Sequence, residues 1–278
     1  MASGRSITRR AEERTSRRAA LFSLAGLAAA VALPARAASS PACGKPLYLT
    51  LDTGHMGVAQ LIADTLKRHD VRVTFFAAHE RTQTGDGSLG NDWAPWWKAR
   101  AAEGHEFAPH TFDHASWRAD LPDGRFKLRP SAGPDAGKDL AWSGEQYRAE
   151  LAKAARRLQE VTGKKPLPLF RAPGGKTSPR LLAAAEEGGW KHVAWAPAGF
   201  LGDELPSELV GNDALLRNAL RDVRAGDILV AHLGIWSRKE PWAPAVLEPL
   251  LGGLRQRGFC FASLRDHPAY REWIAAHP

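Results

Sequence analysis

Apolar residues follow two alternating spacings along the chain from Leu47 onward. In residues 47–51 (LYLTL) and 71–78 (VRVTFFAA), β-branched and aromatic residues form short runs, which predict strands. In residues 58–69 (VAQLIADTLKRH), apolar positions recur at helical spacing, which predicts an amphipathic helix. The same criteria predict further strands over 105–110, 168–172, 191–196, 227–232 and 259–264, and further helices over 92–104, 144–163, 178–189, 213–226 and 244–258.

Strands that alternate with helices predict a parallel sheet with helices packed outside it. The part of the chain after residue 37, about 240 residues, suits one α/β barrel of seven or eight parallel strands. Neither an internal repeat nor a linker divides it. Residues 118–141 interrupt the alternation with several prolines and glycines, and we expect a long irregular loop there, of the kind that carries function or is disordered.

The first 37 residues have the composition of an export signal. Six arginines precede the apolar run that ends at Pro34, and Ala35-Arg36-Ala37 gives the small residues of a cleavage site. The apolar run of roughly 15 residues is short for a bilayer span of about 20. Arg17 and Arg18 directly before it suggest twin-arginine export, with ordinary Sec export as the alternative. We therefore assign 1–37 to a signal peptide and 38–278 to one mature domain, located in the periplasm or secreted.

Removing the signal changes the charge of the protein. Residues 1–37 hold seven Arg and two Glu, so they carry 7 − 2 = +5 of the total +8, and the mature chain is left near +3. Acidic and basic residues are interspersed in it, unlike the clustered basic stripe of a nucleic-acid-binding protein. No later segment is apolar and long enough for a stable membrane span. We expect an exported monomer with no nucleic-acid partner.

The two cysteines, Cys43 and Cys260, allow two interpretations. An oxidising compartment permits one disulfide between them, while two separately buried thiols are equally compatible with the sequence.

Polar side chains directly follow several of the predicted strands. Asp52 follows the first strand, and His110 and His114 follow the strand at 105–110. Arg171 and His232 occupy the ends of two later strands. The carboxyl ends of barrel strands are where such folds place their chemistry, so we expect these side chains to meet.

Each of these residues has a functional and a purely structural interpretation. The pair His110 and His114 lies on one face if the segment is helical, within reach of one metal ion, but such pairs are more often surface polarity. Arg171 could clamp a carboxylate or simply be exposed in a loop. His232 could be a general acid or base, or a partly buried histidine with a backbone partner.

Four of these segments, taken in order, resemble the motifs of the polysaccharide deacetylase family with the NodB homology domain, carbohydrate esterase family four. LTLDTG resembles the first motif, Thr-Phe-Asp-Asp-Gly, and GHEFAPHTFDH the second, His-Ser/Thr-x-x-His. FRAPGG is similar to the third motif, Arg-x-Pro-x-Gly, and DILVAH to the fifth. The resemblance spans about residues 45–265 and implies a distorted (β/α) barrel.

The resemblance also implies an activity, the metal-dependent removal of acetyl groups from a polysaccharide or peptidoglycan, with N-deacetylation of amino sugars first. It makes Asp52 the general base, His232 the general acid, Arg171 the residue that orients the base, and His110 and His114 the ligands of a divalent metal, Zn²⁺ first. The substrate-binding positions that we expect are Val230, Pro173, Gly174, Trp195 and Trp236. Amide hydrolysis supports these roles, because it needs an activated water, oxyanion stabilisation and a proton for the leaving amine.

Two positions depart from the family pattern. The second aspartate of the first motif, normally a metal ligand, is Thr53 here, and a hydroxyl is a much weaker ligand than a carboxylate. The third ligand is therefore Thr53 itself or a substitute, with His55 first and Asp113 and Asp52 as the other candidates. In the fourth motif Trp195 fits, but Asp203 is the only nearby acid in AWAPAGFLGDE, which leaves the tuning of His232 open.

Three alternatives compete with a deacetylase. A catalytically impaired carbohydrate-binding protein would explain Thr53. A glycosidase would need a second carboxylate opposite Asp52, for which Glu106 and Asp203 are the nearest candidates. An aspartic protease would need a second Asp-Thr/Ser-Gly or a small β-rich dimer, and the sequence offers neither.

Overall fold

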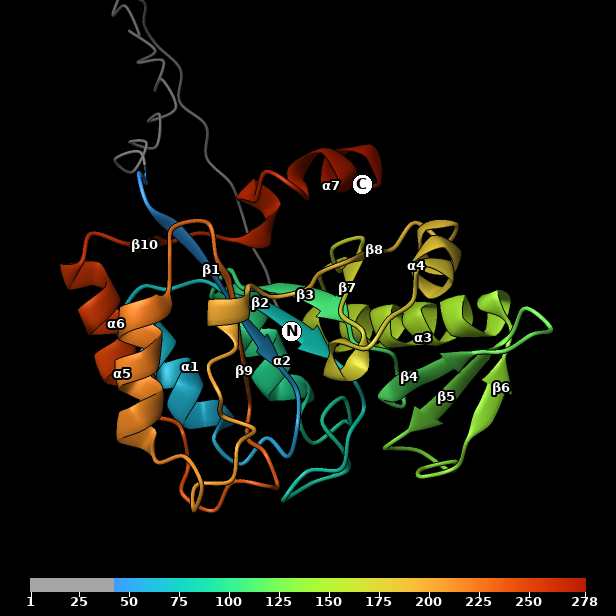
Figure 1. Cartoon of the computed structure of the whole chain (residues 1–278), viewed down its shortest axis with the longest axis horizontal. Coiled ribbons are helices and arrows are strands. Elements are labelled where there is room, and N and C mark those ends of the chain that lie inside the picture. Colours follow the sequence, from blue (N-terminus) through green and yellow to red (C-terminus); the bar gives the residue numbers. More distant parts are fainter. Residues whose placement is uncertain (1–42) are drawn as a thin grey trace, which may run out of the picture. The chain divides into compact units, whose positions relative to one another are not determined.

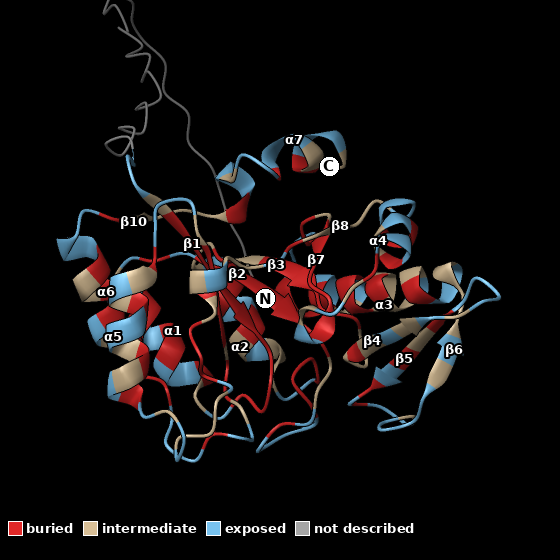
Figure 2. Cartoon of the chain, viewed as in Figure 1, coloured by how far each residue is buried: buried red, intermediate tan, exposed pale blue. Residues whose placement is uncertain are grey.

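Parallel strands form the centre of the protein, whose computed structural model describes residues 43–278. One sheet contains β1 (Pro46–Asp52), β2 (Thr74–Ala77), β3 (Glu106–Pro109), β9 (Ile228–His232) and β10 (Cys260–Phe261), with β1 in contact with β2, β9 and β10. A second parallel pair joins β7 (Leu169–Phe170) to β8 (Lys191–His192). Figure 2 shows β1, β2, β3 and β9 as largely buried, whereas β8 and β10 are of intermediate burial.

Backbone hydrogen bonds continue across the gaps between the two parallel sheets. The Arg171 amide, directly after β7, donates to the Pro109 carbonyl of β3 at 3.1 Å. The Ala196 amide, after β8, donates to the Ile228 carbonyl of β9 at 3.1 Å. The strands therefore follow one another in the irregular manner of a distorted barrel. The predicted α/β class with a parallel sheet is confirmed.

Helices cover the outside of the strands (Figure 1). Helices α1, α5 and α6 pack next to one another, and α3 packs on α2, α4 and β3. A capping box at Ser143 and Gln146 begins α3. The helices are α1 (Ala59–Arg68), α2 (Ala94–Ala102), α3 (Gly144–Thr162), α4 (Pro179–Glu186), α5 (Asn212–Asp222), α6 (Leu247–Gln256) and α7 (Arg271–Ala276).

The prediction of a long irregular loop at 118–141 is wrong, because this segment contains strands of a small antiparallel sheet joined by turns. This sheet consists of β4 (Ala115–Asp120), β5 (Phe126–Pro130) and β6 (Leu140–Trp142), and it lies beside α3 in Figure 1. Phe126 and Leu128 are buried, whereas Lys127 between them is half-buried and Arg129 after them is exposed. This period-two alternation was the missed signal, hidden by the turn residues around it.

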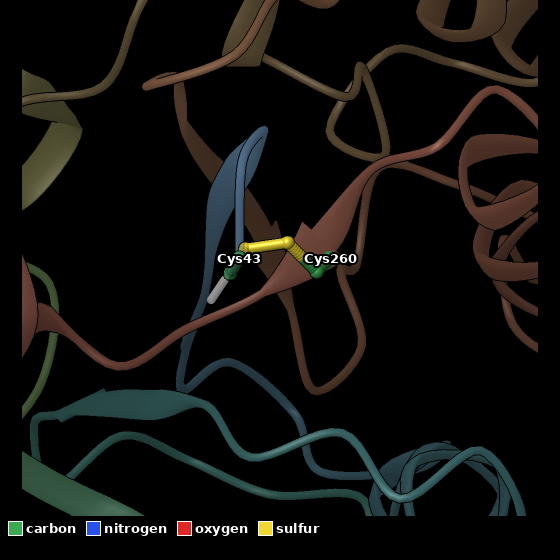
Figure 3. Close-up of a disulfide and its surroundings, with 2 residues drawn as sticks. All are labelled: Cys43 and Cys260. Carbon is green, nitrogen blue, oxygen red and sulfur yellow. A yellow bond between two sulfur atoms is a disulfide. The ribbon is translucent and has the colours of Figure 1, made fainter. Parts of the chain in front are cut away.

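Cys43 and Cys260 form a disulfide (Figure 3) with their Cα atoms 5.9 Å apart. The bridge ties the chain just before β1 to the first residue of β10, and these strands also pair at Pro46 and Cys260. The disulfide interpretation of the two cysteines is therefore the correct one.

The predicted signal peptide lies outside the described residues. Among the helices of residues 43–278, none combines the length and the apolar character needed to cross a bilayer.

Candidate active site

The register of the parallel sheet places two of the candidate residues next to each other. In β1 and β9, Asp52 is the pairing partner of His232, and both are the last residues of their strands. They line a cavity of about 110 Å³ together with His110 and His114. The strand ends named by the sequence are thus brought to one site.

Asp52 is held by a buried ion pair. Its Oδ1 accepts a hydrogen bond from Arg171 Nη1 at 2.6 Å, and both side chains are almost entirely excluded from solvent. The other oxygen, Oδ2, lies 3.7 Å from His110 Nε2. One carboxylate oxygen is therefore fixed, while the other faces the histidine side of the cavity.

Arg171 makes further contacts through Nη1 and Nε. Its Nη1 also donates to Thr50 Oγ1 at 2.8 Å, and its Nε donates to the Val193 carbonyl at 3.2 Å. The guanidinium lies 4.2 Å from the centre of the Phe76 ring, a cation–π distance. The interpretation of Arg171 as an exposed loop residue is excluded by its burial.

The segment from His110 to His114 is a turn, so the helical condition for bringing the two rings together is not met. Thr111 and His114 instead adopt positive φ values of 56° and 51°, which bend the chain sharply. The Thr111 hydroxyl accepts the Ala115 amide at 2.7 Å and stabilises this bend. The ring centres of His110 and His114 still lie 4.9 Å apart. Positive φ at non-glycine residues is costly and is typical of functional sites.

Both histidines have one ring nitrogen engaged. His110 Nδ1 lies 2.8 Å from the Arg171 carbonyl, and His114 Nδ1 lies 2.6 Å from Ser131 Oγ. Such partners orient metal-binding imidazoles and leave the other nitrogen, Nε2, available. Burial, followed by the nearby His114, lowers the pKa of His110 well below its usual 6.5, so its ring is neutral, as a metal ligand must be.

Glu80 is the residue of the cavity that sequence reasoning missed. It lies beyond β2 and lines the same cavity as the two histidines. Its Oε2 accepts a hydrogen bond from the Thr53 hydroxyl at 2.5 Å, and its Oε1 lies 4.0 Å from His114 Nδ1. The available signal was a carboxylate three residues after a buried strand, whereas the sequence argument considered only residues directly at strand ends.

His55, the alternative third ligand, lines a neighbouring cavity of about 150 Å³ on the other side of His232. Its Nδ1 accepts the Gly57 amide at 2.9 Å, and its ring packs edge-on against Trp236. The structure therefore places His55 beside the candidate site and not among the residues that line it.

Two carboxylates hold His232. The backbone amide of His232 donates to Asp203 Oδ2 at 2.6 Å, its Nδ1 lies 3.1 Å from Asp203 Oδ1, and its Nε2 lies 3.0 Å from Glu204 Oε1. Burial acts to lower the pKa of His232, but the charge and hydrogen bonds of Asp203 and the bond to Glu204 raise it well above 6.5. The sequence left open whether Asp203 tunes His232. The structure shows that Asp203 is the acid that orients this histidine.

The expected substrate-binding residues occupy different parts of the site. Val230, Gly174 and Trp195 line the cavity, and Pro173 lines a larger groove that also reaches His114. Trp236 is 56% exposed, with the Arg81 guanidinium 4.9 Å from its ring.

A glycosidase arrangement does not fit these positions. Glu106 is the first residue of β3, two strands away from Asp52 and level with Thr50, and it pairs with Arg265 at 2.8 Å. Asp203 is engaged by His232. Neither acid lines the cavity that Asp52 lines.

The donor types in the cavity fit a divalent metal ion. Two imidazoles whose Nδ1 atoms have other partners, together with one carboxylate, form a set that Zn²⁺ accepts in hydrolases. Among residues 43–278, no three such side chains are already gathered around one point. His110, His114 and a carboxylate of the same cavity would hold the ion.

Comparisons with known proteins agree with this geometry. The sequence model of a family described as "Polysaccharide deacetylase" matches residues 39–193. A chitooligosaccharide deacetylase from Azorhizobium caulinodans is 24% identical over 228 residues, which cover 78% of this chain and 92% of that protein.

Two solved structures share the fold. A family 4 acetyl xylan esterase from Clostridium thermocellum, in complex with a cobalt ion, has a TM-score of 0.63 at 20% identity and covers 82% of this chain and 92% of its own. BA3943 from Bacillus anthracis, described as a CE4 family pseudoenzyme, has a TM-score of 0.58 at 17% identity and covers 80% of this chain and 65% of its own.

Proposed function

The chain belongs to the polysaccharide deacetylase family, and from this premise we propose that it is an exported, metal-dependent hydrolase that removes acetyl groups from amino sugars of a polysaccharide or peptidoglycan. The observation that carries the proposal is the pairing of Asp52 with His232 at the ends of β1 and β9, in one cavity with His110 and His114. A candidate base, a candidate acid and two candidate metal ligands thus line one cavity.

The residues divide the work of amide hydrolysis. Asp52 Oδ2, the oxygen not bonded to Arg171, accepts a proton from the attacking water. His232 keeps its proton because of Asp203 and donates it from Nε2 to the leaving amine. In the structure, Glu204 Oε1 accepts the hydrogen bond from His232 Nε2. When the substrate binds, its nitrogen replaces the Glu204 carboxylate as the partner of Nε2.

A divalent ion on His110 and His114 would supply positive charge where the acyl oxygen becomes an oxyanion. The chain's own contribution is to orient both rings through the Arg171 carbonyl and Ser131. Val230, buried in the cavity wall, is suited to contact the acetyl methyl group.

Cavities on both sides of the site suit a polymeric substrate. A groove of about 460 Å³ shares His114 and Gly174 with the central cavity, and the cavity of about 150 Å³ shares His232 and Ile235 with it. A sugar chain that crosses the site would occupy both neighbours. The exposed face of Trp236 at the second cavity's edge can stack on a pyranose ring.

Export is supported by two independent features. Residues 1–37 have the pattern of a signal peptide, and the Cys43–Cys260 disulfide is stable in an oxidising compartment such as the periplasm or the exterior.

Acetate release tests the proposed activity. The mature protein is incubated with acetylated chitooligosaccharide, peptidoglycan and acetyl xylan in the presence of Zn²⁺ or Co²⁺. We expect release from one of the N-acetylated substrates and none from the Asp52→Asn variant. Absence of release from all three, with circular dichroism showing a folded protein, would contradict the proposal.

A catalytically impaired carbohydrate-binding protein is the second candidate, favoured by Thr53 and by the likeness to the pseudoenzyme fold. Metal content separates the two, because about one equivalent of metal in the purified protein argues against simple erosion of the site.

A further inference from the structure

The Thr53 hydroxyl connects two parts of the candidate site. Its oxygen accepts a hydrogen bond from the Ala78 amide at 3.1 Å and donates its proton to Glu80 Oε2 at 2.5 Å. Thr53 is 1% exposed, so these bonds are shielded from water. Thr53 therefore acts on Glu80 through its hydroxyl group. That hydroxyl is not directed at a metal ion.

The backbone of Glu80 is fixed by a buried serine. The Glu80 amide donates to Ser88 Oγ at 2.8 Å, and the Ser88 amide donates to the Glu80 carbonyl at 2.9 Å. Ser88 Oγ in turn donates to the Ala78 carbonyl at 2.6 Å, and Ser88 is fully buried. The loop after β2 thus holds Glu80 as firmly as a strand end would.

Thr53 and Glu80 form a matched pair. An aspartate at position 53 could accept the Ala78 amide, but without a proton it would face Glu80 as a like charge. Threonine removes that repulsion and provides the donor that Glu80 needs. The second oxygen of Glu80, Oε1, is not bonded to Thr53 and lies 4.0 Å from His114 Nδ1. The Glu80 side chain is only 18% exposed.

From these contacts we propose that Glu80 is the third metal ligand of this protein, in place of the carboxylate that Thr53 lacks, and that Thr53 positions it. The site then contains two imidazoles and one carboxylate, a set known for catalytic zinc. This inference deepens the proposed function and rests on its metal dependence.

Metal binding, measured without substrate, tests the ligand assignment. The mature protein is stripped with a chelator and titrated with Co²⁺ by calorimetry and by its visible absorption. We expect about one equivalent to bind the wild type and Glu80→Gln to bind more than about 100-fold more weakly, because loss of an outer-shell partner alone costs about 10–100-fold. Glu204→Gln is the matched control, since Glu204 lines the same cavity but bonds to His232, and its affinity should stay within about threefold.

Two variants at position 53 separate ligation from folding. Thr53→Val removes the bond to Glu80 and should weaken Co²⁺ binding by about 10-fold, as expected for a positioning residue. In the double variant Thr53→Asp/Glu80→Gln, the new carboxylate faces a neutral amide, and we expect Co²⁺ affinity to return to within about 10-fold of the wild type. A variant that merely failed to fold could not be rescued in this way.

The outcomes distinguish the inference from the function on which it rests. If Glu80→Gln binds Co²⁺ as tightly as the wild type does, the assignment of Glu80 is wrong. It is also wrong if Glu204→Gln loses as much Co²⁺ affinity as Glu80→Gln. Acetate release measured on the same preparations reports the deacetylase activity separately. A wild type that releases acetate but binds no Co²⁺ overturns the metal site and leaves the activity standing.

Discussion

His232 and its carboxylates determine the pH range in which the proposed acid can act. Burial lowers the pKa of His232, but the charge of Asp203, the hydrogen bonds of Asp203 and Glu204 and the charge of Asp52 outweigh it, so the pKa lies well above 6.5. A raised pKa means that the ring keeps its proton to higher pH. Activity that needs this proton is therefore retained through neutral pH and is lost as the pH rises through the pKa of the folded protein.

Replacing Asp203 with asparagine should shift this loss to lower pH. Asp203→Asn removes the charge that most raises the pKa of His232 and keeps a side chain of similar size. We expect the alkaline limb of the pH profile of kcat/KM to move toward neutral pH, with activity below it reduced less. Glu208→Gln, which alters an acid paired with Lys239 on the surface, is the control. An alkaline limb that moves equally in both variants, or in neither, would contradict this role for Asp203.

Arg171 contributes to stability as well as to orientation. Arg171→Met leaves the Asp52 carboxylate buried without its partner, which typically costs about 3–5 kcal/mol of unfolding free energy. Urea unfolding should show this loss. Asp52→Asn in the same background removes the uncompensated charge, so we expect it to recover part of the stability without any acetate release. A stability of Arg171→Met equal to that of the wild type would show that the pair is not buried in solution.

At the scale of elements, the strands that carry the site could be predicted because β1 and β9 are apolar runs that end in a polar residue, and because His110 and Arg171 directly follow β3 and β7. The register Asp52–His232 then follows from pairing two strands of similar length. Glu80 could not be predicted in this way, because it stands three residues beyond β2 and its position depends on bonds from Ser88 and Thr53.

The antiparallel sheet of β4, β5 and β6 was missed for a different physical reason. Its strands are three to six residues long and are separated by turn residues, so the apolar alternation is short and weak. The pairing of β4 with β5 is also irregular between Trp117 and Ala119. The Pro- and Gly-rich composition of this region therefore reflects tight turns between strands.

Because cavities flank the site, we expect the rate of deacetylation to depend on the length of the sugar substrate. Contacts of remote sugars with the groove and with Trp236 provide binding energy that a single sugar cannot. We expect kcat/KM to increase from the monomer to the tetramer of N-acetylglucosamine, and Trp236→Ala to reduce the rate for the tetramer several-fold more than for the monomer. Acetate release across an oligomer series measures this. A rate independent of length would show that the flanking cavities do not bind substrate.

At the scale of the whole molecule, the disulfide connects the beginning of the described fold to its last strand. It joins residues 217 positions apart, so reduction frees a large part of the unfolded chain. We expect the double variant Cys43→Ser/Cys260→Ser to lose about 2–4 kcal/mol of unfolding free energy in urea. Acetate release at 25 °C should change little, because the bridge lies at the opposite end of β1 from Asp52. Addition of a reductant should destabilise only the wild type.

The central claim is that this chain hydrolyses acetyl groups with a metal held in the cavity at the strand ends. The most direct measurement is acetate release from acetylated chitooligosaccharide and peptidoglycan by protein that has been stripped with a chelator and then reconstituted with Co²⁺ or Zn²⁺. We expect release to fall at least about 100-fold on stripping and to return with one equivalent of metal. Full activity in the stripped, folded protein, or none after reconstitution, would contradict the claim.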